Sequence, residues 1–389
     1  MKRKHSWDED VVYNQIGIYP CTFTLPRDDV TQLEFSIDRT DALVDLDRSY
    51  ITTEIQILSE DGKQLKDSEM VAPVNNIGYA LFENCDLYIN DTRITNSDCN
   101  YPWWTYIYNL LSDEAKKRAG QYWAEDTPGK FDSIKENEGF KTRYNIFKGS
   151  SKVKLLVPVM TNRKFERYLP AQMDMILRYT LSSTPLVLMG AKDKNYKIKI
   201  LSAKLFVPRI ILSPHGMRKY EKKSDEFELS SVCTKTRAVS EGDQNLNWTP
   251  FSGRLPHKLY FFMIANEAYN GKINANPYNF ETFGIENCSV LKNDVVLPIS
   301  SGFGNIQEDK YQELYHLSAR DSNFKLPKLE NYDKGYMIVV VNLGREGDEG
   351  SVRVKVDYAN PVAETLTLFC IGEFKDKCTI RKNGQINME

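Results

Sequence analysis

Side chains that could bind a metal ion or act as nucleophiles are few and scattered. The four histidines are His5, His215, His257 and His316, and none stands at metal-ligand spacing from another histidine or from a cysteine pair. The seven cysteines are irregularly spaced: Cys21, Cys85, Cys99, Cys233, Cys288, Cys370 and Cys378. We interpret them as small, mostly buried core residues. The sequence therefore predicts no metal site and no cofactor.

Motifs for phosphate binding and covalent catalysis do not occur either. The chain has no G-x-S-x-G elbow, no P-loop and no G-x-G-x-x-G, and SGFGN at 301–305 lacks the Lys-Ser/Thr of a phosphate cradle. A sugar hydrolase needs only two carboxylates on facing strands, and Asp174 stands between apolar neighbours in QMDMILRYTL. We favour an outward position for Asp174 on an alternating strand. The sequence thus predicts no catalytic residues, and the protein is not expected to be an enzyme.

Length and composition limit the class of protein further. The 389 residues suit two domains of about 200 residues each. A net charge of −2 argues against general nucleic-acid coating, which depends on many Lys and Arg side chains. No apolar run reaches the length of a membrane span, and MKRKHSWDED lacks the apolar stretch of a secretory signal. An odd number of cysteines without such a signal favours reduced thiols in the cytosol or nucleus.

The periodicity of the chain predicts an all-β protein. QLEFSI (32–37) and SVRVKVDY (351–358) alternate apolar and polar residues, which is typical of strands with one buried face. KLYFFMI (258–264) and GYMIVVVNL (335–343) are apolar almost throughout, as strands buried on both faces are. Two helices are expected: one over 101–120, opened by Pro102 and ended by Gly120, and a weaker one over 308–320.

A short internal repeat indicates a duplication. ENCDLYIND (83–91) and ENCSVLKND (286–294) share five of nine residues, and each shared residue recurs after 203 positions. The same shift carries Tyr108 onto Tyr311 and Leu111 onto Leu314. Each half thus has a strand, a hairpin-like Asn-Asp turn and a helix. The sequence predicts two tandem β-sandwiches joined near the charged segment 213–228.

Longer segments at 71–94, 101–111 and 253–285 resemble the double jelly-roll major capsid proteins of Polinton (Maverick) elements and adintoviruses, relatives of the tectivirus–adenovirus capsid lineage. The strongest similarity lies in VAPVNNIGYALFENCDLYINDTRI (71–94) followed by YPWWTYIYNLL (101–111). GRLPHKLYFFMIANEAYNGKINANPYNFETFGI (253–285) is similar to the family's Leu-Pro strand, its Asn-Gly turn and its Asn-Pro-(Phe/Tyr)-Asn-Phe segment. Together with segments 32–57, 196–214 and 331–343, the resemblance covers about residues 30–385.

The resemblance implies two tandem eight-stranded jelly rolls with a few short helices in inter-strand loops. The expected divisions are an N-terminal arm (1–30), a first jelly roll (31–214), a charged linker (215–228) and a second jelly roll (229–389). The implied function is that of a viral major capsid protein, which forms a homotrimeric, pseudo-hexameric capsomer of an icosahedral shell enclosing a DNA genome. The implied partners are other copies of the chain, penton and minor capsid proteins, and packaged DNA only indirectly.

The implied location is the virion capsid, with assembly in the host cytoplasm or nucleus. Segment 120–150 is our candidate for a tower or inter-subunit loop, and MKRKHSWDED for an arm that reaches inward or ties neighbouring capsomers. The alternative is a carbohydrate-binding or carbohydrate-cleaving double jelly roll, which would need exposed aromatics and paired acids in a cleft. A minor capsid or penton component would normally have one barrel, so the internal duplication argues against it.

Overall fold

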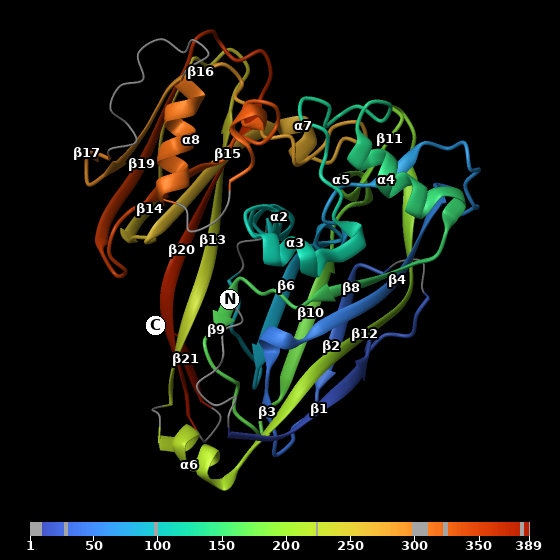
Figure 1. Cartoon of the computed structure of the whole chain (residues 1–389), viewed down its shortest axis with the longest axis vertical. Helices are drawn as coiled ribbons and strands as arrows, with labels where there is room; N and C mark the ends of the chain where they lie inside the picture. Colours follow the sequence, from blue (N-terminus) through green and yellow to red (C-terminus); the bar gives the residue numbers. More distant parts are fainter. Residues whose placement is uncertain are drawn as a thin grey trace.

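Two β-barrels with the same strand order make up the chain (Figure 1). The computed structural model describes residues 10–26, 30–96, 100–222, 225–297, 310–321, 326–381 and 385–388. The first barrel contains eight principal strands: β1 (Val11–Pro20), β2 (Gln32–Ile37), β4 (Tyr50–Ser59), β6 (Phe82–Ile89), β7 (Thr92–Arg93), β8 (Val153–Pro158), β10 (Met175–Leu181) and β12 (Tyr196–Leu212). Its sheets run β1-β12-β4-β8 and β2-β10-β6-β7, and β3 (Leu43–Val44) also pairs with β12.

The second barrel repeats this arrangement. Its principal strands are β13 (Glu226–Val239), β14 (Asn245–Arg254), β15 (Lys258–Ala265), β16 (Ile285–Lys292), β17 (Val295–Val296), β18 (Val339–Asn342), β19 (Glu349–Tyr358) and β20 (Leu366–Ile380). Its sheets run β18-β15-β20-β13 and β14-β19-β16-β17. In both barrels the first, eighth, third and sixth strands form one sheet, and the second, seventh, fourth and fifth form the other. This order is that of a jelly roll, so the predicted fold class is confirmed.

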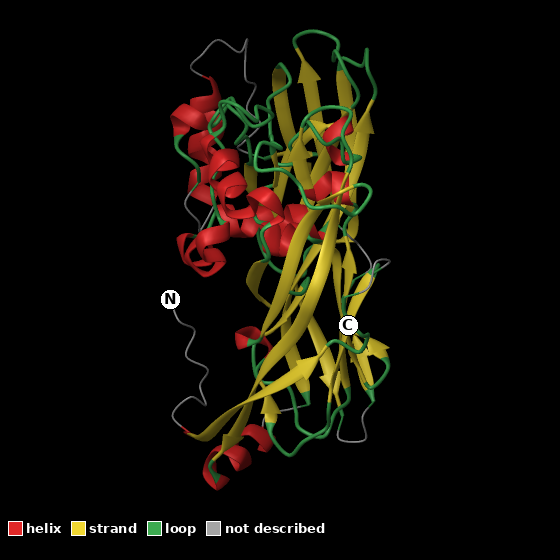
Figure 2. Cartoon of the chain, turned by 90° about the vertical axis from the view of Figure 1, so that its right-hand side faces the viewer, coloured by secondary structure: helices red, strands yellow, loops and turns green. Residues whose placement is uncertain are grey.

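The helices and remaining strands lie in the connections. Figure 2 shows strands running along the long axis and most helices gathered on one flank of the upper half. The helices are α1 (Ile77–Ala80), α2 (Tyr101–Leu110), α3 (Asp113–Ala119), α4 (Glu138–Phe147), α5 (Thr184–Val187), α6 (Pro214–Lys222), α7 (Asn266–Tyr269) and α8 (Lys310–Asp321). β5 (Val71–Pro73) pairs with β11 (Leu188–Gly190), and β21 (Ile386–Met388) pairs with β20.

One strand crosses from the first barrel to the second. β9 (Arg163–Phe165) follows β8 in the chain but pairs antiparallel with Leu229–Ser231 of β13. It therefore extends the β18-β15-β20-β13 sheet at its β13 edge. The two barrels are joined by backbone hydrogen bonds as well as by side-chain packing.

The predicted burial patterns are confirmed in the strands. Leu33, Phe35 and Ile37 of β2 point inward, and Val352, Val354 and Val356 of β19 are fully buried. Residues 258–264 of β15 are buried on both faces, as their uninterrupted apolar sequence predicts. One face of β15 contributes to the second barrel's interior, while the other belongs to the large core cluster that continues into the first barrel.

The repeated nine residues form equivalent hairpins. They cover β6 with its turn into β7 and β16 with its turn into β17. All four turn residues have positive φ: Asn90 (46°), Asp91 (63°), Asn293 (51°) and Asp294 (60°). Two-residue hairpin turns of this kind favour Asn, Asp and Gly. Each asparagine also forms two hydrogen bonds with the backbone of a distant residue, Asn90 with Asp174 just before β10 and Asn293 with Ser351 in β19.

Several sequence predictions need correction or refinement. The single helix expected over 101–120 is two helices, because the Ser112 side chain accepts a hydrogen bond from the Ala115 N–H and starts α3. Helix α8 spans Lys310–Asp321, close to the expected 308–320. Residues 11–20 of the segment assigned to an arm form β1, and the segment assigned to a linker contains most of α6 and the start of β13.

Candidate functional site: the junction between the two barrels

The residues that could bind a metal ion or act in catalysis do not come together at one site. His215 is on α6, His257 precedes β15, His316 is on α8, and His5 and Cys99 lie outside the described residues. Among the residues that the structure describes, no three His, Cys, Asp or Glu side chains could hold a metal ion together. Cys85, Cys288, Cys370 and Cys378 are buried, and burial raises the pKa of each thiol, that of Cys378 to about 11.

Asp174 lies on the surface, as we expected. Its side chain is about half exposed and forms an ion pair with Arg39. The Arg39 side chain lowers the pKa of Asp174 through this hydrogen-bonded contact. Asp174 is therefore part of an exposed ion pair with Arg39.

The segments that carry the family resemblance meet between the barrels instead. PVNN (73–76) ends β5 and enters α1, YPWW (101–104) opens α2, and NPYNF (276–280) precedes β16. Trp103 Nε1 donates to Pro277 O at 3.0 Å, and Tyr278 Oη donates to Pro102 O at 3.3 Å. Motifs more than 170 residues apart in the sequence are thus in direct contact.

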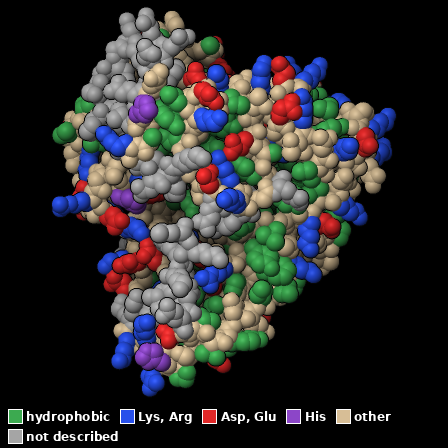
Figure 3. Space-filling view, viewed as in Figure 1, with side chains coloured by type: hydrophobic (Ala, Val, Ile, Leu, Met, Phe, Trp, Pro, Cys, Tyr) green, Lys and Arg blue, Asp and Glu red, His purple; other side chains and the backbone are tan. Residues whose placement is uncertain are grey.

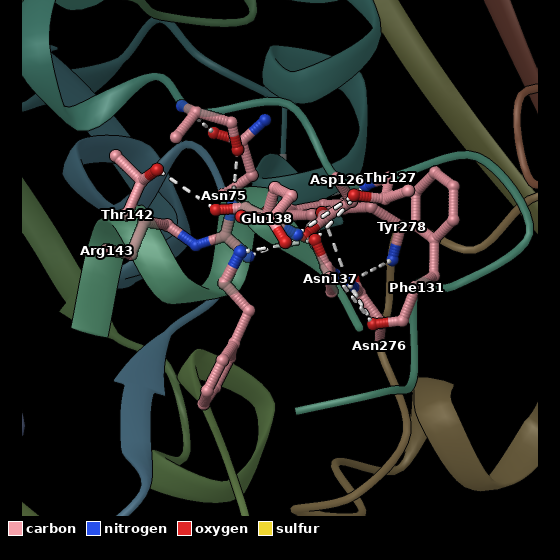
Figure 4. A network of polar contacts seen from close by, with 12 residues as sticks. Asn75, Asp126, Thr127, Phe131, Asn137, Glu138, Thr142, Arg143, Asn276 and Tyr278 are labelled. Atoms are coloured by element: carbon pink, nitrogen blue, oxygen red, sulfur yellow. Dashed lines mark hydrogen bonds and ion pairs between the residues drawn. The ribbon is translucent and has the colours of Figure 1, made fainter. Parts of the chain in front are cut away.

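A buried polar network lies at the centre of this junction (Figure 4). Asp126 accepts hydrogen bonds from Arg143 Nη2 at 2.6 Å, Asn137 Nδ2 at 2.7 Å and Asn276 Nδ2 at 3.1 Å. All four side chains are at most 2% exposed. Because Asn276 belongs to the second barrel and the others belong to the first, the carboxylate of Asp126 links the two.

Arg143 fixes the network to the first barrel. Its Nε donates to Pro73 O at 2.8 Å, and its Nη1 donates to Ala124 O. Asn75 Oδ1 accepts from the Ala124 N–H at 3.0 Å. The PVNN segment is therefore hydrogen-bonded to Arg143 and to the loop that carries Asp126. A buried guanidinium with carboxylate and carbonyl partners satisfies the requirement that buried charges be paired.

A second polar contact lies beside the first. Asp132 accepts from the Asn276 N–H at 2.5 Å and from Asn279 Nδ2 at 2.9 Å. Burial raises the pKa of this carboxyl. Gly129 N–H donates to Lys334 O at 2.9 Å, and Tyr336 Oη donates to Asp126 O at 2.7 Å. The segment 126–132 of the first barrel is thus bonded to two separate connections of the second.

Aromatic packing completes the junction. The rings of Tyr106 and Tyr278 are stacked with centroids 3.9 Å apart, and Trp103 lies 5.1 Å from Phe369 of β20. Gly335 has a φ of +96°, and a Cβ there would lie 2.3 Å from the ring of Phe131. Only glycine fits this approach without displacing the ring. Around Tyr106, Tyr278 and Phe131 the two barrels are therefore closely packed against each other.

Segment 120–150 differs from our expectation. It was predicted to be a tower or inter-subunit loop, yet Asp126, Phe131, Asn137, Phe140 and Arg143 within it are buried inside one chain. Sequence reasoning missed these residues because the segment has neither strand nor helix periodicity over most of its length. The available signal was Asn137, whose side chain caps α4 by accepting from the Phe140 N–H.

A cavity of about 840 Å³ opens below α2, between the end of β8, β9 and the second barrel. Its walls include Trp104 and Tyr260, which are nearly buried and expose little ring surface for stacking on a sugar. His257 Nε2 lies 3.7 Å from Glu373 Oε2, and Glu373 Oε1 accepts a hydrogen bond from Tyr260 Oη at 3.0 Å. The cavity offers a histidine–acid pair, and its lining also includes Tyr108 and Phe374, which are only partly buried.

Comparisons with known proteins agree with the fold. No protein-family model matches the chain. An uncharacterized protein of Caenorhabditis elegans is 22% identical over 292 residues, covering 70% of this chain and 68% of that protein. No helix within the described residues is long and apolar enough to cross a membrane.

Several solved structures are similar to the whole chain or nearly all of it. A chain of the Sputnik virophage aligns with a TM-score of 0.69 at 11% identity, covering 100% of this chain and 90% of that one. The mavirus major capsid protein gives 0.59 at 9% identity, covering 100% and 92%. The Faustovirus major capsid protein gives 0.55 at 8% identity, covering 94% and 90%. The chain therefore has the double jelly-roll fold found in these viral proteins.

Proposed function

We propose that the chain is a viral major capsid protein. Three copies would form a six-barrel, pseudo-hexagonal capsomer, and capsomers would tile an icosahedral shell around a DNA genome. Its partners would be other copies of itself together with penton and minor capsid proteins. It would act in the virion capsid after assembly in the host cytoplasm or nucleus, and packaged DNA would be contacted only indirectly.

The observation that carries this proposal is the pair of jelly rolls locked by a buried junction. Two barrels of the same topology are joined by the Asp126 network and by β9, so one chain supplies two similar units in a defined arrangement. Closed rotational symmetry is the usual arrangement of identical subunits, and three two-barrel chains would give a six-barrel ring. The similarity to the mavirus and Faustovirus capsid proteins supports the same role.

The lineage follows from the sequence resemblance. The PVNN, YPWW and NPYNF segments resemble those of Polinton and adintovirus capsid proteins, and all three lie at the junction. We therefore propose that the chain belongs to this branch of the double jelly-roll capsid proteins.

Mass photometry and negative-stain microscopy of the purified protein test the proposal. The expected species has three times the 44.9 kDa chain mass and shows six lobes when viewed end-on. Larger closed shells would demonstrate self-assembly. A monomer or dimer at every protein concentration and salt concentration tested would overturn the proposal.

A further inference from the structure

The outer face of the second barrel's β18-β15-β20-β13 sheet is covered within the chain. Phe262 of β15 and Phe369 of β20 are register partners, and their rings stack with centroids 4.8 Å apart. Both are at most 1% exposed. Trp103 of the first barrel lies 5.1 Å from Phe369 and covers this pair.

The first barrel has a similar aromatic pair, which is only partly covered by the residues that the structure describes. Tyr50 of β4 and Phe206 of β12 occupy the third and eighth strands of their barrel, as Phe262 and Phe369 do. They are register partners, and their rings stack with centroids 4.7 Å apart. Both side chains are only partly buried. The two pairs thus differ in what covers them rather than in how they are built.

Further apolar residues surround the uncovered pair. Ile18 of β1 is the register partner of Phe206, and Pro158 of β8 is that of Tyr50, so these side chains share one face of the sheet. Ile18 is 58% exposed, and Leu156 on the same face of β8 is 51% exposed. Hydrophobic side chains gather over the region of β4 and β8 in Figure 3. We call the outer face of the β1-β12-β4-β8 sheet the open face.

The edge strands β1 and β13 of the two equivalent sheets also differ in whether another strand pairs with them. In the second barrel, β9 pairs with β13 and covers that edge. In the first barrel, the equivalent strand β1 pairs with β12, and no other strand among the described residues pairs with it. A ten-residue edge strand with exposed apolar side chains is a template for association unless something covers it.

The second barrel also has exposed apolar side chains, on β17. Six of the eight exposed large hydrophobic side chains in the described part of the chain lie on β1, β8 and β12, and the other two are on β17. Val295 and Val296 of β17 are 66% and 50% exposed. The equivalent end of the first barrel is instead part of the junction, where Ile94 is buried and its carbonyl accepts from Arg163 Nη1 at 2.8 Å. Figure 1 places β17 at one margin of the molecule and β4, β8 and β12 on the opposite side.

We propose that the open face binds the second barrel of another copy of this chain, with the β16–β17 hairpin as part of the contact. Within one chain, the first barrel covers the outer face of a sheet of the second barrel. In the proposed contact, the second barrel of one chain would cover the open face on the first barrel of another. Because the two surfaces are different and lie on opposite sides, the association is head-to-tail and can close into a ring. The inference rests on the proposed function and assigns the surfaces that form its trimer.

Two charge substitutions test the pairing of these surfaces. Ile18→Asp alters the open face and Val295→Asp alters the β16–β17 hairpin, and neither side chain is part of the core of a single chain. Each variant should run as a 44.9 kDa monomer in mass photometry, because a carboxylate would be buried without a partner in the contact. An equimolar mixture should give a species of twice the chain mass, since one intact open face and one intact hairpin remain to pair.

Matched controls separate association from folding. Tyr88→Ser alters the opposite sheet of the first barrel, whose outer face carries the Glu34–Arg178 ion pair, and it should leave the trimer intact. The thermal unfolding midpoints of the charge variants should match that of the Tyr88→Ser protein within about 2 °C when all are compared as monomers at high dilution. Leu156→Asp is a second variant of the open face if Ile18→Asp fails to fold.

The outcomes distinguish this inference from the proposed function. Trimers in the wild type and also in both charge variants would overturn the inference and leave the capsomer proposal standing. Monomeric variants whose mixture forms no dimer would show that the two surfaces do not meet, which also overturns it. A monomeric wild type would overturn the proposed function itself.

Discussion

In each barrel a helical connection joins the fifth strand to the sixth. The two connections start from equivalent hairpins but pack against different parts of the molecule. In the first barrel, the connection from β7 to β8 carries α2, which packs Trp103 against Tyr269 and Phe369 of the second barrel. In the second barrel, the connection from β17 to β18 carries α8, which packs on its own barrel. There the Ser318 hydroxyl accepts from the Val340 N–H at 3.1 Å.

The difference shows what a duplicated fold preserves. The strand order, the stacked pair between the third and eighth strands, and the Asn-Asp turn are the same in both copies. Loops tolerate change better than the strands they connect, and here the connections differ while the strand order is the same. One connection forms part of the contact between the barrels, and the other packs on a single barrel.

Removing the central charge of the junction should have the largest effect. Arg143→Ala leaves the buried carboxylate of Asp126 without its ion-pair partner, so unfolding free energy should fall by about 3–5 kcal/mol. Urea titration followed by tryptophan fluorescence measures this, because Trp103, Trp104 and Trp123 lie in the connection from β7 to β8. The matched control is Arg353→Ala, whose partly exposed pair with Asp294 on the second barrel should contribute less than about 1 kcal/mol. Equal losses would contradict the central position of Asp126.

Truncation in α8 should have an intermediate and local effect. Leu314 is 5% exposed and packs in the interior cluster of the second barrel, so Leu314→Ala should lower stability by about 2–3 kcal/mol. Amide hydrogen exchange should accelerate in β18 and remain unchanged in β6. Gln312→Ala, on the exposed side of the same helix, is the control and should change neither. Faster exchange in both barrels would mean that α8 supports the junction as well.

The turn asparagines should give the smallest effect, and it should be the same in both barrels. Asn90→Ala and Asn293→Ala each place alanine at positive φ and remove a side-chain hydrogen bond, from the Asp174 N–H and the Ser351 N–H respectively, at a cost of about 1–2 kcal/mol. Asp91→Gly should be neutral or slightly stabilising, because glycine adopts positive φ freely, whereas Asp294→Gly also removes the ion pair with Arg353 and should gain less. Urea midpoints of the four variants provide the comparison. A large effect in only one barrel would show that the repeated residues no longer share a role.

Local patterns made much of the fold predictable from the sequence. The alternation in QLEFSI and SVRVKVDY fixes which face of each strand is buried, and the structure follows it. The uniform apolar sequence of residues 258–264 indicated burial on both faces, although nothing local identified Trp103 as the covering residue. The repeat at 83–91 and 286–294 identified equivalent hairpins correctly because turn geometry is a local requirement.

The junction could not be predicted because its partners are distant in sequence. Asp126 and Asn276 are 150 residues apart, and the segment around Asp126 has no periodicity that marks it as buried. Strand β1 was missed for a related reason. Its residues are mostly exposed on both faces in a single chain, so VVYNQIGIYP lacks the alternation of a half-buried strand.

The crossing of β9 has a consequence for how the two halves depend on each other. The covalent path between the barrels runs through α6, whereas β9, the Asp126 network and the Trp103 contacts hold them together elsewhere. A proteolytic nick within α6 would therefore leave two fragments that remain associated, and fragments expressed separately would be expected to complement each other. In this sense the molecule is a heterodimer whose two subunits happen to be translated as one polypeptide.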